Sequence, residues 1–188
     1  QIETLHNRLA LEIRRENPID AISPPADSAN HYTSAVVSQI HILLTYGCTY
    51  ECDHCFLYSS PHAPGTFTRA RIASVLDQAR DMGNVEWIYF EGGEPFLYYA
   101  QMVEGLRMAR DRGFSTGIVT NGYWATSEDD AEVWLRPLAE LEVADISFSE
   151  DDLHGSGETA PVKTAIKAAK KMGLPTGVIQ IDSPTQDK

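Results

Sequence analysis

The sequence has few cysteines, few basic residues and no long hydrophobic run, and each shortage excludes a class of protein. Three cysteines in 188 residues are an odd number, which argues against a disulfide framework and fits a reducing cytoplasm. The 15 Lys and Arg face 27 Asp and Glu, and the net charge of −12 repels phosphate backbones, so we expect no nucleic-acid partner. No apolar run reaches the roughly 18 residues of a membrane helix, so we expect no membrane association.

Hydrophobic patterns divide the chain into a leader and an α/β core. Residues 1–34 contain a helical pattern at 3–16 and then a loop with Pro18, Pro24 and Pro25, so we place the domain boundary between residues 34 and 35. Residues 35–188 contain five strand-like runs with helical patterns between them. The expected strands are Val36–Leu44, Val85–Phe90, Ser115–Val119, Ala144–Phe148 and Thr176–Ile181.

Four helices are expected between these strands. Apolar residues recur at helical spacing in Thr68–Met82, Tyr98–Arg112, the segment after Ser127 and Ala160–Met172, and three of the patterns end at a glycine. Ser127 and Asp130 resemble a capping box, and Pro137 is expected to kink or split the helix that they begin. The basic cluster in the last helix is interpreted as its solvated face; it consists of Lys163, Lys167, Lys170 and Lys171.

The alternation of strands and helices predicts successive βαβ units in a parallel sheet. We therefore expect an α/β fold, a partial (β/α) barrel of about five to six parallel strands. Active sites in such folds lie at the carboxyl ends of the strands, and polar or ligand residues follow four of the five expected strands.

The three cysteines follow the first expected strand, as Cys48-Thr-Tyr-Glu-Cys52-Asp-His-Cys55. Three thiolates on one loop can hold a [4Fe-4S] cluster whose fourth iron stays open for another ligand. The alternative is a structural zinc ion with His54 or His62 as the fourth ligand, since three cysteines and one histidine are a common closed zinc site.

A second motif, Glu91-Gly92-Gly93-Glu94-Pro95, follows the second expected strand. Together with the cysteine spacing it resembles the radical S-adenosylmethionine (SAM) superfamily. The resemblance implies a [4Fe-4S] cluster held by Cys48, Cys52 and Cys55, which are the metal-binding and catalytic residues, and SAM bound at the open iron. It implies reductive cleavage of SAM to a 5′-deoxyadenosyl radical that abstracts hydrogen from an unknown substrate, a small molecule or a peptide. The electron requires a reductant such as a flavodoxin or a ferredoxin.

The resemblance also assigns residues to the cofactor. His54 is expected against the adenine, and Gly92, Gly93 and Glu94 are expected to receive the methionine ammonium, with Glu91 the less certain acidic contact. Asn121 is expected to face SAM or the substrate, and Ser147 or Ser149 to hold the ribose. Asp152 and His154, in the polar loop that begins at Asp151, are candidate substrate residues.

Two alternatives from other classes remain open at this point: a zinc-stabilised α/β binding module and a degenerate barrel that binds SAM without turnover. The chain ends soon after the fifth expected strand. We therefore expect a minimal sheet, a fragment of a longer protein, or a barrel closed by a partner or a further segment.

Overall fold

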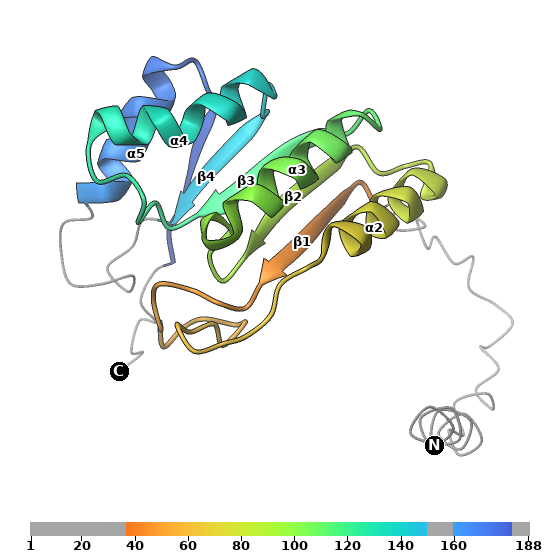
Figure 1. Cartoon of the computed structure of the whole chain (residues 1–188), viewed down its shortest axis with the longest axis horizontal. Helices are drawn as coiled ribbons and strands as arrows, with labels where there is room; N and C mark the ends of the chain where they lie inside the picture. Colours follow the sequence, from red (N-terminus) through yellow and green to blue (C-terminus); the bar gives the residue numbers. More distant parts are fainter. Residues whose placement is uncertain (1–36, 150–159, 182–188) are drawn as a thin grey trace, which may run out of the picture. The chain divides into compact units, whose positions relative to one another are not determined.

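The computed structural model describes residues 37–149 and 160–181, which belong to one compact unit. Five parallel strands form one sheet in the order of the sequence, β1-β2-β3-β4-β5 (Figure 1). The strands are β1 (Gln39–Thr45), β2 (Trp87–Gly92), β3 (Ser115–Thr120), β4 (Asp145–Ser149) and β5 (Thr176–Ile179). This confirms the predicted α/β fold with five parallel strands. The leader, and with it the predicted boundary at residue 34, lies outside the described residues.

The helices that connect the strands are α2 (Arg69–Met82), α3 (Tyr99–Arg110), α4 (Glu128–Glu140) and α5 (Ala160–Lys171), and the short 3-10 helix η2 (Pro95–Tyr98) precedes α3. Their ends follow the capping signals. Thr68 caps α2, which ends at Gly83 in the left-handed conformation, and the Ser127 hydroxyl accepts a hydrogen bond from the Asp130 backbone N–H at 3.1 Å.

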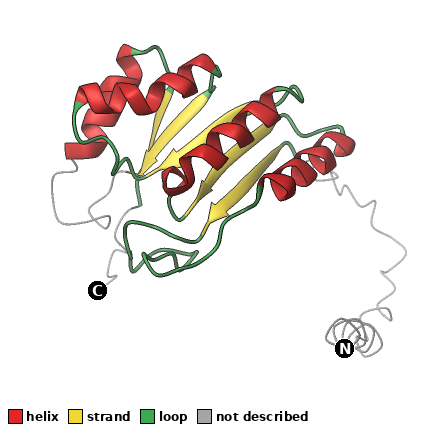
Figure 2. Ribbon diagram, in the orientation of Figure 1, coloured by secondary structure: helices red, strands yellow, loops and turns green. Residues whose placement is uncertain are grey.

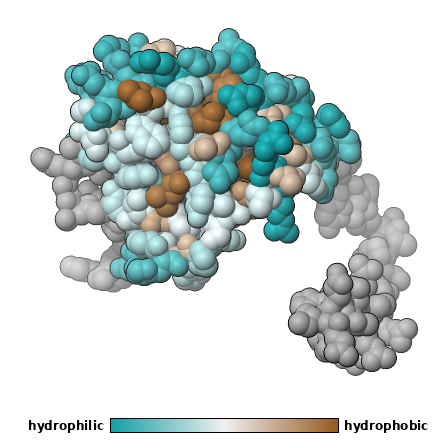
Figure 3. Space-filling model, in the orientation of Figure 1, coloured by the Kyte–Doolittle hydropathy of each residue, from teal (hydrophilic) through white to brown (hydrophobic). Residues whose placement is uncertain are grey.

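One face of the sheet carries the helices, as Figure 2 shows, and the hydrophobic core lies between the sheet and these helices. Alternate strand residues are fully buried there, among them Leu44, Phe90, Ile118 and Phe148. The helices contribute Leu76, Leu106 and Leu135 to the same core. The outer surface of the helices is mainly hydrophilic, and its hydrophobic residues form small separate patches (Figure 3).

The opposite face of the sheet carries polar residues, because strand side chains alternate between the two faces. His41 stacks on Tyr89 with ring centroids 4.7 Å apart, and its Nδ1 lies 3.1 Å from Glu91 Oε2. The Ser147 hydroxyl donates to Asp145 Oδ2 at 2.9 Å on this face. The carboxyl ends of the strands meet at one edge of the sheet, where the cysteine loop also lies (Figure 2).

Pro137 does not split its helix, contrary to one of the two outcomes expected. Helix α4 runs without interruption from Glu128 to Glu140. Proline removes the hydrogen bond to the carbonyl four residues earlier, here that of Val133, whose residue is 66% exposed. This part of the helix therefore lies at the solvent-exposed surface, where an unpaired carbonyl costs least.

The lysines of α5 lie beside acidic residues of α4. Lys171 Nζ is 2.5 Å from Glu132 Oε1, and Lys167 pairs with Glu128. Their ion pairs are solvent-exposed, as expected for the solvated face of a helix. Within the described ranges, no helix is long and apolar enough to span a bilayer.

Candidate functional site: a cavity at the carboxyl edge of the sheet

The site begins with the loop that follows β1, which returns to the end of its own strand. The Thr45 hydroxyl donates to Gly65 O at 2.7 Å, and the Thr66 hydroxyl donates to Leu44 O at 3.0 Å. Near its start, Cys48 N donates to Ser60 O at 3.1 Å. These hydrogen bonds hold a loop of about 20 residues at the sheet edge, and all three cysteines lie within this loop.

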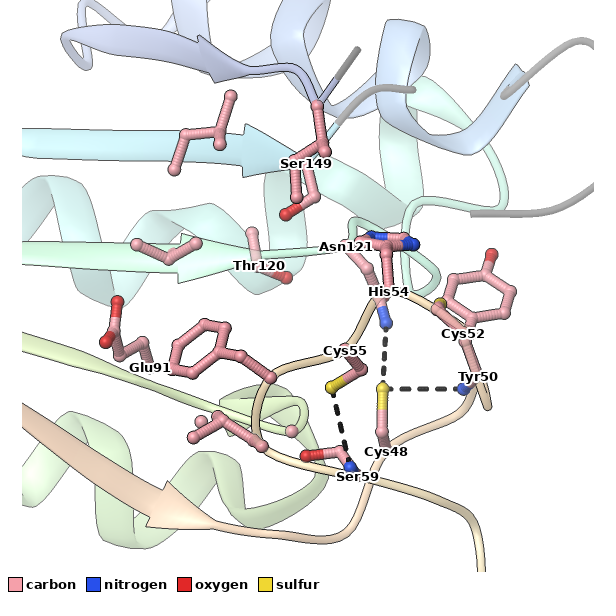
Figure 4. Close-up of a pocket in the computed structure, with 17 residues that line it drawn as sticks. Cys48, Tyr50, Cys52, His54, Cys55, Ser59, Glu91, Thr120, Asn121 and Ser149 are labelled. Carbon is pink, nitrogen blue, oxygen red and sulfur yellow. Dashed lines mark hydrogen bonds between the residues drawn. The ribbon is translucent and has the colours of Figure 1, made fainter. Parts of the chain in front are cut away.

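The three cysteines line one cavity of about 200 Å³; each is half-buried, and none forms a disulfide. Cys48 Sγ accepts hydrogen bonds from Tyr50 N at 3.4 Å and from Asn121 Nδ2 at 3.6 Å, and Cys55 Sγ accepts one from Ser59 N at 3.5 Å (Figure 4). Burial raises the pKa of the Cys48 thiol, against the effect of these two donors. In the described part of the chain, no three His, Cys, Asp or Glu side chains are placed to hold one metal ion.

Two glycines let the loop after β2 contact the cysteine loop backbone to backbone. Gly93 N donates to Thr45 O at 2.7 Å, and Glu94 N donates to Gly47 O at 2.8 Å. A Cβ on Gly93 would lie 2.1 Å from Gly47 O, and one on Gly92, where φ is 132°, would lie 2.4 Å from Thr45 O. Glycine is therefore required at both positions, and both line the cavity.

Gly92→Ala should separate β2 from the cysteine loop, because its new methyl group would overlap the backbone carbonyl of Thr45, which has little room to move. We expect the free energy of unfolding to fall by about 1–3 kcal/mol, the cost of an overpacked site. Urea denaturation measures this loss. Gly113→Ala is the control for a glycine with positive φ, because no atom lies within 4 Å of a Cβ at Gly113. An equal loss in both variants would mean that backbone strain, not the loop contact, determines the effect.

Glu94 is fully buried beneath the cavity, and both of its carboxylate oxygens accept hydrogen bonds from the protein. Oε1 accepts from Phe96 N at 3.0 Å and from the Thr120 hydroxyl at 2.9 Å, and Oε2 accepts from Asn121 N at 2.8 Å. Desolvation raises the pKa of Glu94 to about 7, and the three donors oppose that rise. The side chain thus joins the Gly-Gly-Glu loop to the end of β3.

Glu91 is the acidic residue of this motif that lines the cavity. Its side chain is 21% exposed and its carboxylate lies beside His41. The difference between the two glutamates has a simple cause. Glu91 is the next-to-last residue of β2, on the polar face of the sheet, whereas Glu94 follows the two glycines and caps η2 by accepting from Phe96 N.

The end of β3 brings Asn121 to the cysteine loop. Its Oδ1 accepts from Tyr123 N at 3.1 Å, while its Nδ2 donates to Thr49 Oγ1 at 3.0 Å. The Thr120 hydroxyl accepts from Trp124 Nε1 at 3.1 Å and from Gly122 N at 3.2 Å. The Thr120 hydroxyl proton therefore points to Glu94. The end of β3 is thus held by a connected set of hydrogen bonds.

A comparison with protein families shows the superfamily of this chain. The family model described as the radical SAM superfamily matches residues 42–182, about three quarters of the chain. The chain belongs to the radical SAM superfamily. Membership implies SAM and an iron–sulfur cluster as cofactors.

Curated relatives cover part of this radical SAM chain. It is 32% identical over 115 residues to the tungsten-containing aldehyde ferredoxin oxidoreductase cofactor-modifying protein of Pyrococcus furiosus, covering 61% of this chain and 31% of that protein. It is 33% identical over 86 residues to an S-adenosylmethionine-dependent nucleotide dehydratase of Selenomonas ruminantium, covering 45% of this chain and 30% of that one. The chain thus spans less than a third of the length of either relative.

A solved structure has the same fold. The crystal structure of methylornithine synthase matches 76% of this radical SAM chain and 44% of its own, with a TM-score of 0.57 and 13% identity. The five-stranded sheet therefore corresponds to part of a TIM-barrel-like enzyme fold.

The side chains present fit a thiolate-bound cluster in this radical SAM protein. Soft thiolate ligands suit iron–sulfur clusters or zinc, and the three cysteines line one cavity. The Ser59 hydroxyl borders the same cavity, is buried, and has no hydrogen-bond partner among the described residues. A buried hydroxyl of this kind normally has a partner, and a cluster sulfur within the cavity would provide one.

The predicted cofactor residues divide into two groups in the structure. The cavity is lined by His54, Gly92, Gly93, Asn121 and Ser149 as well as the cysteines. The side chains of Glu94 and Ser147 instead make the internal hydrogen bonds described above. Their contacts with SAM stay predictions. The candidate substrate residues Asp152 and His154 lie outside the described residues.

Sequence analysis did not single out several residues that line the cavity, among them Tyr50, Ser59, Val119, Ile179 and Ile181. Tyr50 lies within the cysteine run and Ser59 just after it, so their positions in the sequence already indicated that they could line the site. Ile179 pairs with Ser149 across β4 and β5, and this register depends on the folded sheet. The sequence signal for Ile179 was only its alternate position in an expected strand.

Proposed function

We propose that this chain is the core of a cytoplasmic radical SAM enzyme with one [4Fe-4S] cluster bound by Cys48, Cys52 and Cys55. The observation that carries the proposal is that all three cysteines line one cavity, which Gly92 and Gly93 also line. When bound, the cluster and SAM supply a one-electron cleavage of the sulfonium, which yields methionine and a 5′-deoxyadenosyl radical that abstracts hydrogen from a substrate.

The chain's own residues bind and shield the cofactors. The backbone of Gly92 and Gly93 is open to close approach, because neither residue has a side chain. Glu91 places a carboxylate on the cavity wall, where an ammonium group of SAM would be attracted. We propose His54 as the adenine contact and Ser149 as the ribose contact. Apolar residues such as Val119 and Ile179 line the remaining wall.

The reaction needs one electron per cleavage, which we assign to a low-potential reductant such as a flavodoxin or a ferredoxin. The substrate is a small molecule or a peptide that enters from the polar face of the sheet. We propose that a further segment or a partner covers that face, since the relatives are more than three times as long as the matched region.

Anaerobic reconstitution with iron and sulfide tests the proposal. We expect about four irons and four sulfides per chain, and 5′-deoxyadenosine when SAM and dithionite are added. The readouts are iron and sulfide analysis and chromatography of the nucleoside, with SAM or dithionite omitted as controls. A protein that holds one zinc and no iron would instead be the zinc-stabilised binding module. A protein with a full cluster that releases no 5′-deoxyadenosine would be the degenerate barrel.

A further inference from the structure

We propose that Asn121 sets the reduction potential of the cluster by donating a hydrogen bond from its side-chain amide to the Cys48 thiolate. This inference rests on the proposed function, because it requires Cys48 to be a cluster ligand. Asn121 Nδ2 lies 3.6 Å from Cys48 Sγ, and Figure 4 shows the contact crossing from the end of β3 to the cysteine loop. The donor therefore belongs to a residue outside the cysteine loop.

The orientation of the Asn121 amide is fixed by its other contacts. Its Oδ1 accepts from Tyr123 N, a group that can only donate, so the NH₂ group must face the other way. That direction contains Thr49 Oγ1 at 3.0 Å and Cys48 Sγ. The reversed amide would place an oxygen against the sulfur and an NH₂ group against an N–H, which is unfavourable on both sides. Asn121 thus presents a donor to the thiolate.

The backbone of Asn121 is held as firmly as its side chain. Its N–H donates to the buried carboxylate of Glu94 at 2.8 Å, and the residue is only 7% exposed. Glu94 is therefore a positioning residue for the amide. Because the amide has little room to move, we expect it to remain at the sulfur in both redox states.

A donor at this position favours the reduced cluster. The added electron increases negative charge on the cluster and its thiolates, so a hydrogen bond to sulfur strengthens on reduction and raises the potential. Partial burial strengthens the effect by excluding water. Tyr50 and Ser59 donate to cysteine sulfurs through their backbone. Of these three donors, Asn121 is the one that a substitution can remove.

The test is a redox titration of the reconstituted full chain without SAM, followed by electron paramagnetic resonance of the reduced cluster. At the potential where half of the wild-type cluster is reduced, we expect roughly one tenth to be reduced in Asn121→Ala, a tenfold change that equals 59 mV for one electron. Asn121→Asp retains an acceptor for Tyr123 N and adds a negative charge, so its potential should fall at least as far.

Thr49→Val is the matched control. It removes the other partner of the same NH₂ group and leaves the donor to Cys48 in place. The inference requires the ratio of reduced to oxidised cluster in Thr49→Val, at the wild-type midpoint potential, to stay within twofold of the wild-type ratio. If Thr49→Val shifts the potential as much as Asn121→Ala does, the loop position is responsible and the inference is wrong. It is also wrong if both Asn121 variants load a full cluster with the wild-type potential. Failure of the wild-type chain to bind iron would instead refute the proposed function.

Discussion

Replacing Cys48, Cys52 or Cys55 with alanine should abolish iron loading and SAM cleavage together. In the proposed cluster each thiolate would bind a different iron, and among the described residues these three cysteines line the cavity. Two remaining ligands cannot hold the cluster against loss to solvent, so we expect less than about a tenth of the wild-type iron. Iron analysis and 5′-deoxyadenosine formation, both measured after anaerobic reconstitution, check this prediction.

Ser59→Ala separates ligand loss from a general disturbance of the cavity. Ser59 is buried at the same cavity but has a hydroxyl in place of a thiol, so its removal should leave most of the iron bound. The apo forms of all four variants should unfold near the wild-type denaturant midpoint, because the cysteines are only half-buried and act as small side chains. A single-cysteine variant that keeps full iron and full cleavage would overturn the ligand assignment.

The hydrophobic pattern was sufficient to predict the fold, because both the strands and the helices have strong periodic signals. Each expected strand appears within a few residues of its observed bounds, and each expected helix between strands is present. Ser127 caps α4 as the sequence indicated. The split expected at Pro137 was wrong, while the kink stays a prediction; the cost of a proline depends on the solvent exposure of its helix, which is a property of the folded protein.

Motifs predicted which loops form the site but not the direction of each side chain. Glu91 and Glu94 flank the same two glycines, and nothing local to the sequence distinguishes a buried carboxylate from one on the cavity wall. The distinction arises from contacts distant in sequence. Thr120 and Asn121 bring donors from the end of β3 to Glu94, and His41 meets Glu91 from β1. Ser147 and Ser149 share one face of β4, yet only Ser149 reaches the cavity.

Exchanging each glutamate for glutamine should separate the two roles. In Glu94→Gln, an NH₂ group replaces one oxygen and meets at least one of the three donors, whichever way the amide is turned. We expect the free energy of unfolding to fall by about 1–3 kcal/mol, the cost of a buried donor without an acceptor. Glu91→Gln changes only a partly exposed contact with His41, so stability should change by less than about 1 kcal/mol.

Affinity for SAM should follow the opposite order. Losing a charge-assisted hydrogen bond to the SAM ammonium costs about 1.5–3 kcal/mol, which is roughly ten-fold to over a hundred-fold in the dissociation constant. We expect this loss in Glu91→Gln, measured by calorimetry on the reconstituted protein. If Glu94→Gln instead weakens SAM binding while its stability stays at the wild-type level, the Glu94 carboxylate is the ammonium ligand, as the family resemblance alone implied.

The pH dependence of stability gives a further check on Glu94. Its pKa rises from 4.5 to about 7 on folding, so between those values the folded state keeps a proton that the unfolded chain has released. This group's contribution to the free energy of unfolding should therefore fall as the pH rises from 4.5 to about 7, by at most about 3 kcal/mol, and stay constant above that. Glu94→Gln has no proton to release and should lack this slope, whereas Glu91→Gln should retain it. Urea titrations of the apo proteins between pH 5 and 8 provide the comparison. Parallel profiles for the wild type and Glu94→Gln would mean that the three donors keep Glu94 ionised throughout that range.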